Sequence, residues 1–180
     1  MAAGEASLVS GMLAGVEPED FSVFYRREMP RLVQFVKAVS SALDWHAATD
    51  VAQTAFERVL LRWAGLTQPK AYLYKVARNE ALARCAAMRR ELPAGVLPER
   101  ADEVSAALAA GWRDEQRAVM EHLRSLPVKQ REVMTWTLAG FTDAEIAGVL
   151  GLSTDSVKAN RHYARKNLRK RLGSGKEGTR

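Results

Sequence analysis

Apolar residues in the first half of the chain recur three and four positions apart, which is the spacing of one face of an α-helix. A first helix is expected to begin at Pro18, with the acidic Glu19 and Asp20 in its first turn. Pro30 lies inside this pattern and is expected to kink or break the helix. The apolar positions of this segment are expected to pack in a core: Phe21, Phe24, Tyr25, Leu32, Phe35, Val36 and Val39.

Two more helices are expected in this half, from about residue 47 to 63 and from about 69 to 90, with Gly65 in the loop between them. Between Lys70 and Arg90 the chain carries six basic residues against one acidic residue, interleaved with tyrosines. Such a surface can neutralise phosphates and stack on unpaired bases. An ordinary solvated helix face often has the same composition, so this pattern alone does not decide between the two.

The second half begins with an expected helix from about residue 112 to 125 and continues with another that starts at Pro127. Thr142 then reads as a helix N-cap, and Glu145 three residues later completes a capping box before an apolar run. Gly151 is the expected stop of this short helix, because glycine tolerates the left-handed backbone of a C-cap.

Ser153 is expected to cap a second helix, with Asp155 in its first turn. One side of this helix is apolar, with Val157, Ala164 and Leu168 at helical spacing. The opposite side is mainly basic and carries Lys158, Ala159, His162, Lys166 and Arg169, flanked by Arg165. Two capped helices joined by a glycine turn, the second with a basic outer face, predict a helix-turn-helix that binds the DNA major groove.

The distribution of charge supports two nucleic-acid-facing modules. The 180 residues carry a net charge of +6 and are 47% apolar, which is enough for folded cores. The net charge is +3 over residues 1–90, −4 over 91–121 and +6 over 129–180. No strand pattern is present, so an all-α fold of two small helical domains and a flexible linker is expected. The expected boundaries are 1–17 for an N-terminal tail, 18–91 and 112–172 for the domains, 92–111 for the linker and 173–180 for a C-terminal tail.

Several classes of site are not supported. The single cysteine, Cys85, excludes an intramolecular disulfide and a cysteine-based zinc site, and is expected to be an ordinary helix residue. His46 and Asp50 have metal-ligand spacing but lack a third ligand, so no metal or cofactor is expected. The sequence shows neither a signal peptide nor a run of about 20 apolar residues, which predicts a soluble, cytoplasmic protein without membrane insertion.

Two segments together resemble an extracytoplasmic-function sigma factor of the bacterial sigma-70 family. FYRREMPRLVQFV, TDVAQTAFERVLLRW and QPKAYLYKVARNEALARCAAMRR are similar to region 2 of that family. HLRSLPVKQREVMTWTLAGFTDAEIAGVLGLSTDSVKANRHYARKNLRKRL is similar to its region 4. The resemblance covers roughly residues 20–91 and 112–172, with no region 3 between them, as in this subgroup.

The resemblance implies that region 2 docks on the β′ clamp helices of core RNA polymerase, through positions that correspond to Asp50, Gln53, Glu57 and Arg58. It also implies recognition and melting of the promoter −10 element. The matching positions for unpaired bases are Trp63, Tyr72 and Asn79, and those for phosphates are Lys70, Lys75, Arg78 and the arginines that follow. The family further implies no enzymatic activity of its own, and its members are often held inactive by an anti-sigma factor.

Region 4 would contact the β flap of the polymerase and place the basic helix in the major groove of the −35 element. The residues assigned to this promoter contact are Thr142, Ser153, Lys158, Ala159, His162, Arg165, Lys166 and Arg169. Arg161 departs from the family pattern, because it stands where an apolar residue is usual, so it must snorkel outward or pair. Tyr163 stands where arginine is common, and Arg84 and Cys85 stand where acidic and polar residues are common.

Two other interpretations remain at this stage. A free-standing, dimeric helix-turn-helix regulator would explain residues 127–171 equally well but would leave the first half without a purpose. A metal-dependent nuclease would have to use His46, Asp50 and Glu57, which form no recognisable catalytic cluster. The acidic segment 91–121 is interpreted as a solubilising linker, with imitation of nucleic acid as the alternative.

Overall fold

The computed structural model describes residues 20–91 and 114–174. The predicted N-terminal tail, the predicted linker 92–111 and residues 175–180 lie outside these described residues, as do Pro18, Glu19 and Trp112. The C-terminal tail was predicted to begin at Gly173, but α9 continues through Gly173 to Ser174. Within them the fold is all-α, as predicted, and contains no strand. The elements are α2 (Phe21–Val39), α3 (Trp45–Leu60), the 3₁₀ turn η1 (Trp63–Gly65), α4 (Pro69–Glu91), α6 (Asp114–Arg124), α7 (Val128–Leu138), α8 (Asp143–Leu150) and α9 (Thr154–Ser174).

The first helix differs from the sequence prediction in where it begins and at Pro30. α2 begins at Phe21, because the Asp20 side chain caps it by accepting from the Ser22 amide at 2.8 Å. The helix then runs through Pro30 to Val39 without a break. Pro30 is exposed, whereas large apolar residues on both sides of it are buried, so packing of the helix outweighs the lost hydrogen bond.

The second predicted helix is shifted toward the N-terminus. α3 begins at Trp45, after Asp44 accepts a hydrogen bond from the Ala47 amide at 2.7 Å, and ends at Leu60. Trp63 therefore lies outside the helix, in η1, where the chain turns toward α4. The remaining helices agree with the predicted segments to within two residues.

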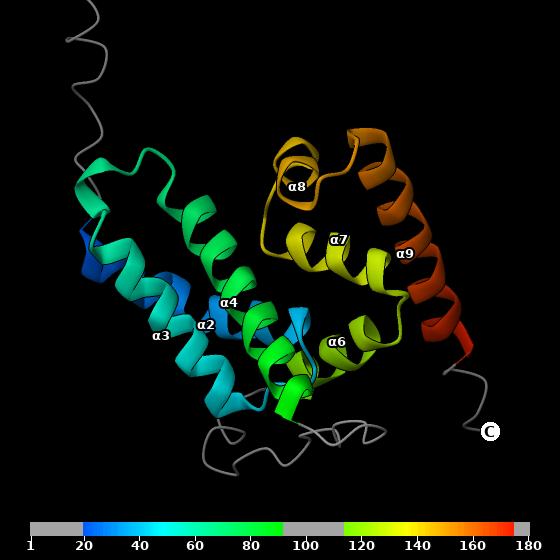
Figure 1. Ribbon diagram of the computed structural model, residues 1–180. Coiled ribbons are helices and arrows are strands. Elements are labelled where there is room, and N and C mark those ends of the chain that lie inside the picture. The colour runs from blue at the N-terminus through cyan, green and yellow to red at the C-terminus, as the bar shows by residue number, and fades with distance from the viewer. Residues whose placement is uncertain (1–19, 92–113, 175–180) are drawn as a thin grey trace, which may run out of the picture.

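The helices form two groups that pack against each other. α2, α3 and α4 lie together in one group, and α7, α8 and α9 form the other, with α6 beside α7 and α2 (Figure 1). One cluster of buried side chains spans both groups, because Phe35 and Tyr74 of the first contact Trp136 and Phe141 of the second. The ring centroids of Phe35 and Trp136 are 4.8 Å apart, and those of Tyr74 and Phe141 are 5.2 Å apart.

Polar contacts also join the two groups. The ammonium of Lys70 donates to the carbonyl of Ala139 at 2.7 Å, and the Arg78 guanidinium lies 2.9 Å from the Glu132 carboxylate. The described structure is therefore a closed one, in which the helix-turn-helix packs on the N-terminal helices.

Candidate nucleic-acid interface

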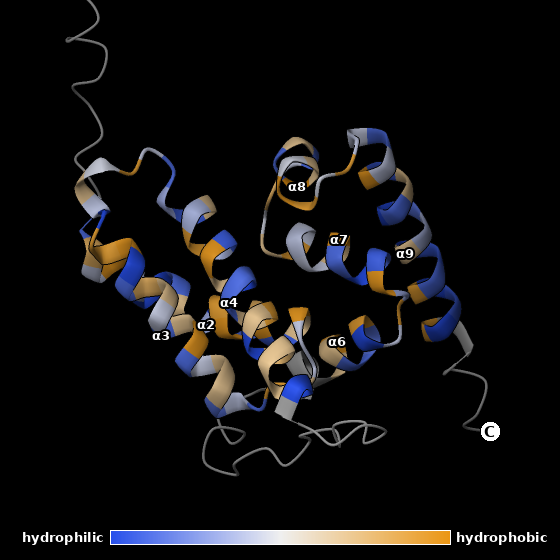
Figure 2. Ribbon diagram, in the orientation of Figure 1, coloured by the Kyte–Doolittle hydropathy of each residue, from blue (hydrophilic) through white to orange (hydrophobic). Residues whose placement is uncertain are grey.

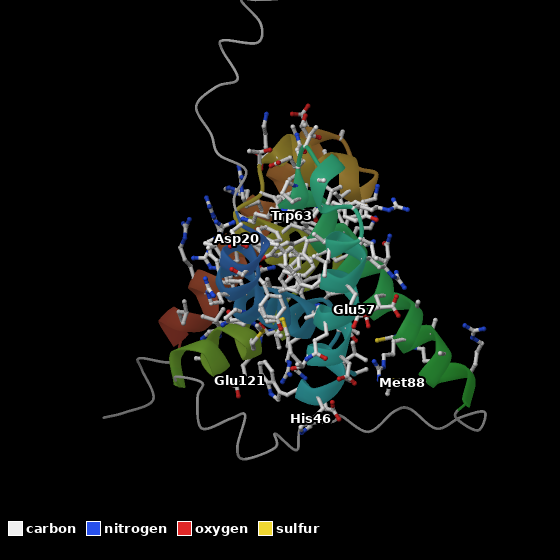
Figure 3. All side chains as sticks on the ribbon, turned by 90° about the vertical axis from the view of Figure 1, so that its left-hand side faces the viewer. Asp20, His46, Glu57, Trp63, Met88 and Glu121 are labelled. Carbon is white, nitrogen blue, oxygen red and sulfur yellow. The ribbon has the colours of Figure 1, made fainter. Side chains whose placement is uncertain are left out.

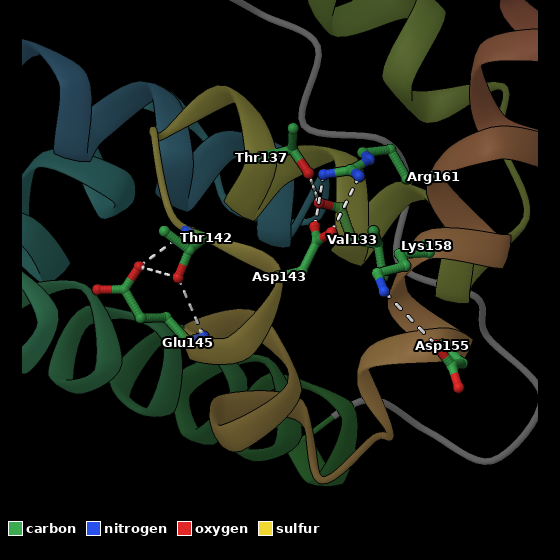
Figure 4. Close-up of polar contacts among 8 residues, drawn as sticks. All are labelled: Val133, Thr137, Thr142, Asp143, Glu145, Asp155, Lys158 and Arg161. Atoms are coloured by element: carbon green, nitrogen blue, oxygen red, sulfur yellow. Dashed lines mark hydrogen bonds and ion pairs between the residues drawn. The ribbon is translucent and has the colours of Figure 1, made fainter.

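The helix-turn-helix forms as the sequence predicts. The Thr142 hydroxyl accepts from the Glu145 amide at 3.4 Å, and the Glu145 carboxylate accepts from the Thr142 hydroxyl and amide, both at 2.7 Å (Figure 4). Gly151 ends α8 with φ of 65°, a left-handed backbone that glycine adopts at low cost. These local bonds fix where α8 begins and ends, and hence how α9 is presented.

The capping box predicts a measurable contribution to stability. Thr142→Ala is expected to destabilise the helix-turn-helix by about 1 kcal/mol, because it leaves an amide of the first turn without its partner. The Thr142 hydroxyl, followed by its amide, lowers the pKa of Glu145 from its ordinary value of 4.5. The folded pKa is thus below the unfolded one, so this contribution is present above pH 4.5 and is lost as the pH falls through the folded pKa. Urea unfolding at pH 7 and pH 3 tests both points: the effect of Thr142→Ala should be smaller at pH 3, and equal effects would contradict the assignment.

The outer side of α9 is exposed over its whole basic surface. Val157 and Ala164 are fully buried against the other helices, which turns the opposite side outward. The residues of this exposed side, hereafter the α9 basic face, are Lys158, Ala159, His162, Arg165, Lys166 and Arg169. Figure 2 shows hydrophilic residues along much of α9. Six predicted −35 residues are therefore accessible together on one helix face.

The other two predicted −35 residues are engaged in helix caps. Thr142 belongs to the capping box of α8, and the Ser153 hydroxyl accepts from the Ser156 amide at 3.1 Å at the start of α9. Both side chains are exposed, so the caps leave room for a further contact to a phosphate.

A polar face is also exposed on α3, and it holds the four residues assigned to polymerase docking. Asp50, Gln53, Glu57 and Arg58 are all exposed, and this set is hereafter the α3 polar face. Figure 3 shows Glu57 on this side of the molecule, between His46 and Trp63. The sequence analysis did not identify the partners from α4: Glu80 lies 2.8 Å from Arg58, and Arg84 lies 3.5 Å from Asp50. No local signal reveals these partners, because they are 22 and 34 residues away.

The residues assigned to the −10 element are divided between two environments. Trp63 is half-buried against the rings of Phe21 and Phe24, at centroid distances of 5.2 and 5.0 Å. Tyr72 is also half-buried, with the Arg62 guanidinium 5.8 Å from its ring centroid.

The polar members of this set differ in accessibility. Lys75 and Asn79 are exposed, whereas Lys70 and Arg78 are held by Ala139 and Glu132 of the second group. Only part of the predicted −10 surface is thus free in the closed structure.

Tyr74 corrects one feature of the predicted surface. It is 1% exposed, and its hydroxyl donates to the buried carboxylate of Glu28 at 3.0 Å, so it does not belong to a face of tyrosines and cations. Burial, followed by the neighbouring Glu28 charge, raises the pKa of Tyr74 well above 10.

Apolar side chains beside Trp63 are a feature that the sequence analysis missed. Leu61 is 86% exposed and Leu60 is 53% exposed, and together with residues 62–66 they line a shallow hollow. Leu61 follows the last residue of α3 and does not continue the spacing of the buried residues of that helix. This break in the apolar pattern is the signal that could have identified Leu61 as exposed. Exposed leucines cannot stack as aromatic rings do, but such apolar side chains can insert between base steps and unstack them.

Other classes of site find no support in the described parts of the chain. No three His, Cys, Asp or Glu side chains among the described residues lie close enough to hold a metal ion. None of the described helices is long and apolar enough to cross a membrane. Cys85 is buried, with its sulfur 2.8 Å from the Ser40 hydroxyl.

Comparison with known sequences matches both halves of the chain. A family described as sigma-70 region 2 matches residues 24–91, and one described as sigma-70, region 4 matches residues 116–168. The probable RNA polymerase sigma factor RfaY of Xanthomonas campestris pv. campestris is 29% identical over 160 residues. That alignment covers 82% of this chain but 40% of the relative, so the chain spans less than half of the relative's length.

Two solved structures have a similar fold. CnrH in complex with the cytosolic domain of CnrY has a TM-score of 0.58 and 22% identity, and the match covers 93% of this chain and 96% of that one. The sigma factor RpoE in complex with the anti-sigma factor NepR from Bartonella quintana has a TM-score of 0.61 and 21% identity, over 90% and 99% of the two chains. At these identities the likeness concerns the fold.

Proposed function

This chain belongs to the sigma-70 family, and we propose that it is a sigma factor of the extracytoplasmic-function type, which directs core RNA polymerase to specific promoters and initiates their melting. The observation that supports this most strongly is the pair of exposed surfaces on one chain, the α3 polar face in the region 2 match and the α9 basic face in the region 4 match. A dimeric helix-turn-helix regulator would use only the second surface and leave residues 24–91 without a role, so it is not favoured.

The proposal gives each surface one task. The α3 polar face would dock on the β′ clamp helices, and region 4 would contact the β flap. The α9 basic face would read the −35 element, where a good bidentate contact to a base contributes about 1–3 kcal/mol of discrimination. Trp63, Tyr72 and Asn79 would receive unpaired bases of the −10 element, with Lys70, Lys75 and Arg78 on the phosphates. Stacking contributes about 1–3 kcal/mol per base, which can offset the few kcal/mol needed to unstack it.

The proposal also covers partners and domain limits. The protein would act without catalysis of its own, as a subunit of the polymerase, with residues 18–91 and 112–172 as its two working domains. The RpoE structure contains an anti-sigma factor, and its fold matches almost the whole of this chain, which supports an anti-sigma partner here as well.

A pull-down of bacterial core RNA polymerase tests this function. Wild-type protein is expected to retain the polymerase, and the double variant Asp50→Ala/Gln53→Ala is expected to lose it, because both side chains are exposed members of the α3 polar face. Neither residue is buried, so the variant should remain folded, which far-UV circular dichroism checks.

Asp155→Ala provides a control, because it removes an exposed carboxylate from α9, outside the α3 polar face that would dock on the β′ clamp helices. It should retain the polymerase as well as wild type does. Failure of the folded wild-type protein, purified free of any inhibitor, to bind core polymerase would overturn the proposed function.

A further inference from the structure

Arg161 occupies an unusual place on the recognition helix. Its side chain is 28% exposed and lies beside the buried stripe of α9, with Val157 one turn before it and Ala164 one turn after it, both fully buried. Its two terminal nitrogens donate to the two carboxylate oxygens of Asp143, at 2.5 and 2.9 Å (Figure 4). The Asp143 side chain is 20% exposed. Arg161 therefore pairs rather than snorkels, and its partner is the first residue of α8.

The pair lies at the boundary between the buried side of α9 and its DNA-facing side. At about 100° per residue, Arg161 is rotated about 40° from Val157 around the helix axis. Lys158 and Arg165 of the α9 basic face lie only about 60° and 40° further round. A modest rotation of α9 about its axis would thus bring Arg161 into the basic face and move the base-facing residues away from their present direction.

The two hydrogen bonds from Arg161 to the Asp143 carboxylate resist such a rotation better than apolar packing does. The guanidinium is planar, and two parallel hydrogen bonds to one carboxylate fix both its distance and its orientation. An apolar side chain at the same position would be held by contacts that have little directional preference. Asp143 is itself held at the N-terminus of α8, where the helix dipole favours a carboxylate. The Asp143–Arg161 pair therefore restricts rotation of α9 about its axis relative to α8.

We propose that Asp143 and Arg161 are a positioning pair for promoter recognition. The pair sets the rotation of α9 in the major groove, and it keeps the Arg161 charge away from the DNA backbone. Asp143 then determines specificity without touching DNA. This inference rests on the proposed function, because it requires α9 to read a promoter element.

The test compares specific with non-specific binding in the assembled polymerase. Wild-type protein, bound to bacterial core RNA polymerase, is used to enrich duplexes from a random-sequence pool. The ratio of affinities for an enriched duplex and for the unselected pool is then measured for each variant at several salt concentrations. Asp143→Asn is expected to lower this ratio at least fivefold. It is also expected to steepen the salt dependence of pool binding by about one phosphate contact, since Arg161 is released.

Two further variants separate geometry from charge. Asp155→Asn makes the same charge change within the helix-turn-helix, but its carboxylate is 91% exposed and lies 3.6 Å from Lys158, so the ratio should stay within twofold of wild type. Arg161→Lys retains the positive charge but cannot form the two parallel hydrogen bonds to Asp143. It should lower the ratio of specific to pool affinity at least threefold without changing the salt dependence of pool binding. This second variant also decides the matter if Asp143→Asn does not fold.

If folded Asp143→Asn or Arg161→Lys has the same ratio of specific to pool affinity as the wild-type protein, the positioning role is overturned. An equal loss of ratio in Asp155→Asn would overturn it as well, because charge alone would then explain the effect. If the wild-type protein enriches no sequence at all, the proposed function itself fails, which is a distinct result.

Discussion

Replacing Trp136 with alanine is expected to lower the free energy of unfolding by about 3–5 kcal/mol, the usual cost of deleting a large aromatic side chain from a core. The side chain is 1% exposed, and its ring contacts Phe35 and Phe141 at centroid distances of 4.8 and 4.9 Å. Phe35 belongs to α2 and Phe141 follows α7, so the cavity would open where the two helix groups meet. Urea unfolding followed by circular dichroism measures the loss.

Two variants make this prediction specific. Leu138→Ala changes an apolar residue of the same helix that is 59% exposed, so its effect should stay within about 0.5 kcal/mol. Trp136→Phe retains an aromatic ring and removes the indole N–H, which is buried without a hydrogen-bond partner in the described structure. It should therefore cost less than half as much as alanine. A loss below about 1 kcal/mol for Trp136→Ala would show that this ring does not hold the closed core together.

The sequence predicted the helix-turn-helix well because its determinants are local. The capping box joins Thr142 to Glu145, and the stop depends on Gly151, so each signal and its effect lie within one or two helical turns. The exposed side of α9 could be predicted for the same reason, because Val157, Ala164 and Leu168 lie within one helix and define its buried side. Helix ends were less predictable where competing caps were available, as at Asp20 and Asp44.

Structural features that depend on contacts between residues far apart in the sequence could not be predicted from local signals. Glu28 is buried and accepts from Tyr74, 46 residues later, which removes Tyr74 from the surface that the sequence pattern suggested. Pro30 was expected to interrupt α2, but tertiary packing of the residues around it decides the outcome. For Arg161 the sequence analysis left two alternatives open, and only the fold identifies Asp143 as its partner, 18 residues away.

The closed arrangement has a consequence for the proposed function. The −10 and −35 elements are separated by about 25 base pairs, which is about 85 Å of DNA at 3.4 Å per base pair. A compact chain of this length has a radius of gyration of about 16 Å, and is therefore only about 40 Å across. It cannot place one group of helices on each element while the two groups stay packed. Promoter binding must then separate Lys70 from Ala139 and Arg78 from Glu132, which frees both cations for phosphates.

Bridging the two groups is therefore expected to abolish promoter opening. Gln34 of α2 and Leu138 of α7 line the same cavity of about 530 Å³ between the groups. Gln34→Cys and Leu138→Cys, in a Cys85→Ser background, would be joined by a short bismaleimide that contains an internal disulfide. Permanganate reactivity of unpaired thymines then reports opening by the reconstituted holoenzyme on a duplex enriched by the wild-type protein. Bridged protein should give background reactivity, because its two surfaces cannot reach both elements.

Reduction of the linker gives the matched control on the same molecules, since it frees the two groups and should restore opening. A second control places both thiols in α2, at Arg31 and Gln34, where the bridge joins residues of one helix and should leave opening unchanged. Persistent opening by the fully bridged protein would mean that promoter melting does not require the groups to separate. The closed packing of Trp136 against α2 would then be compatible with function, and the length argument would be wrong for this chain.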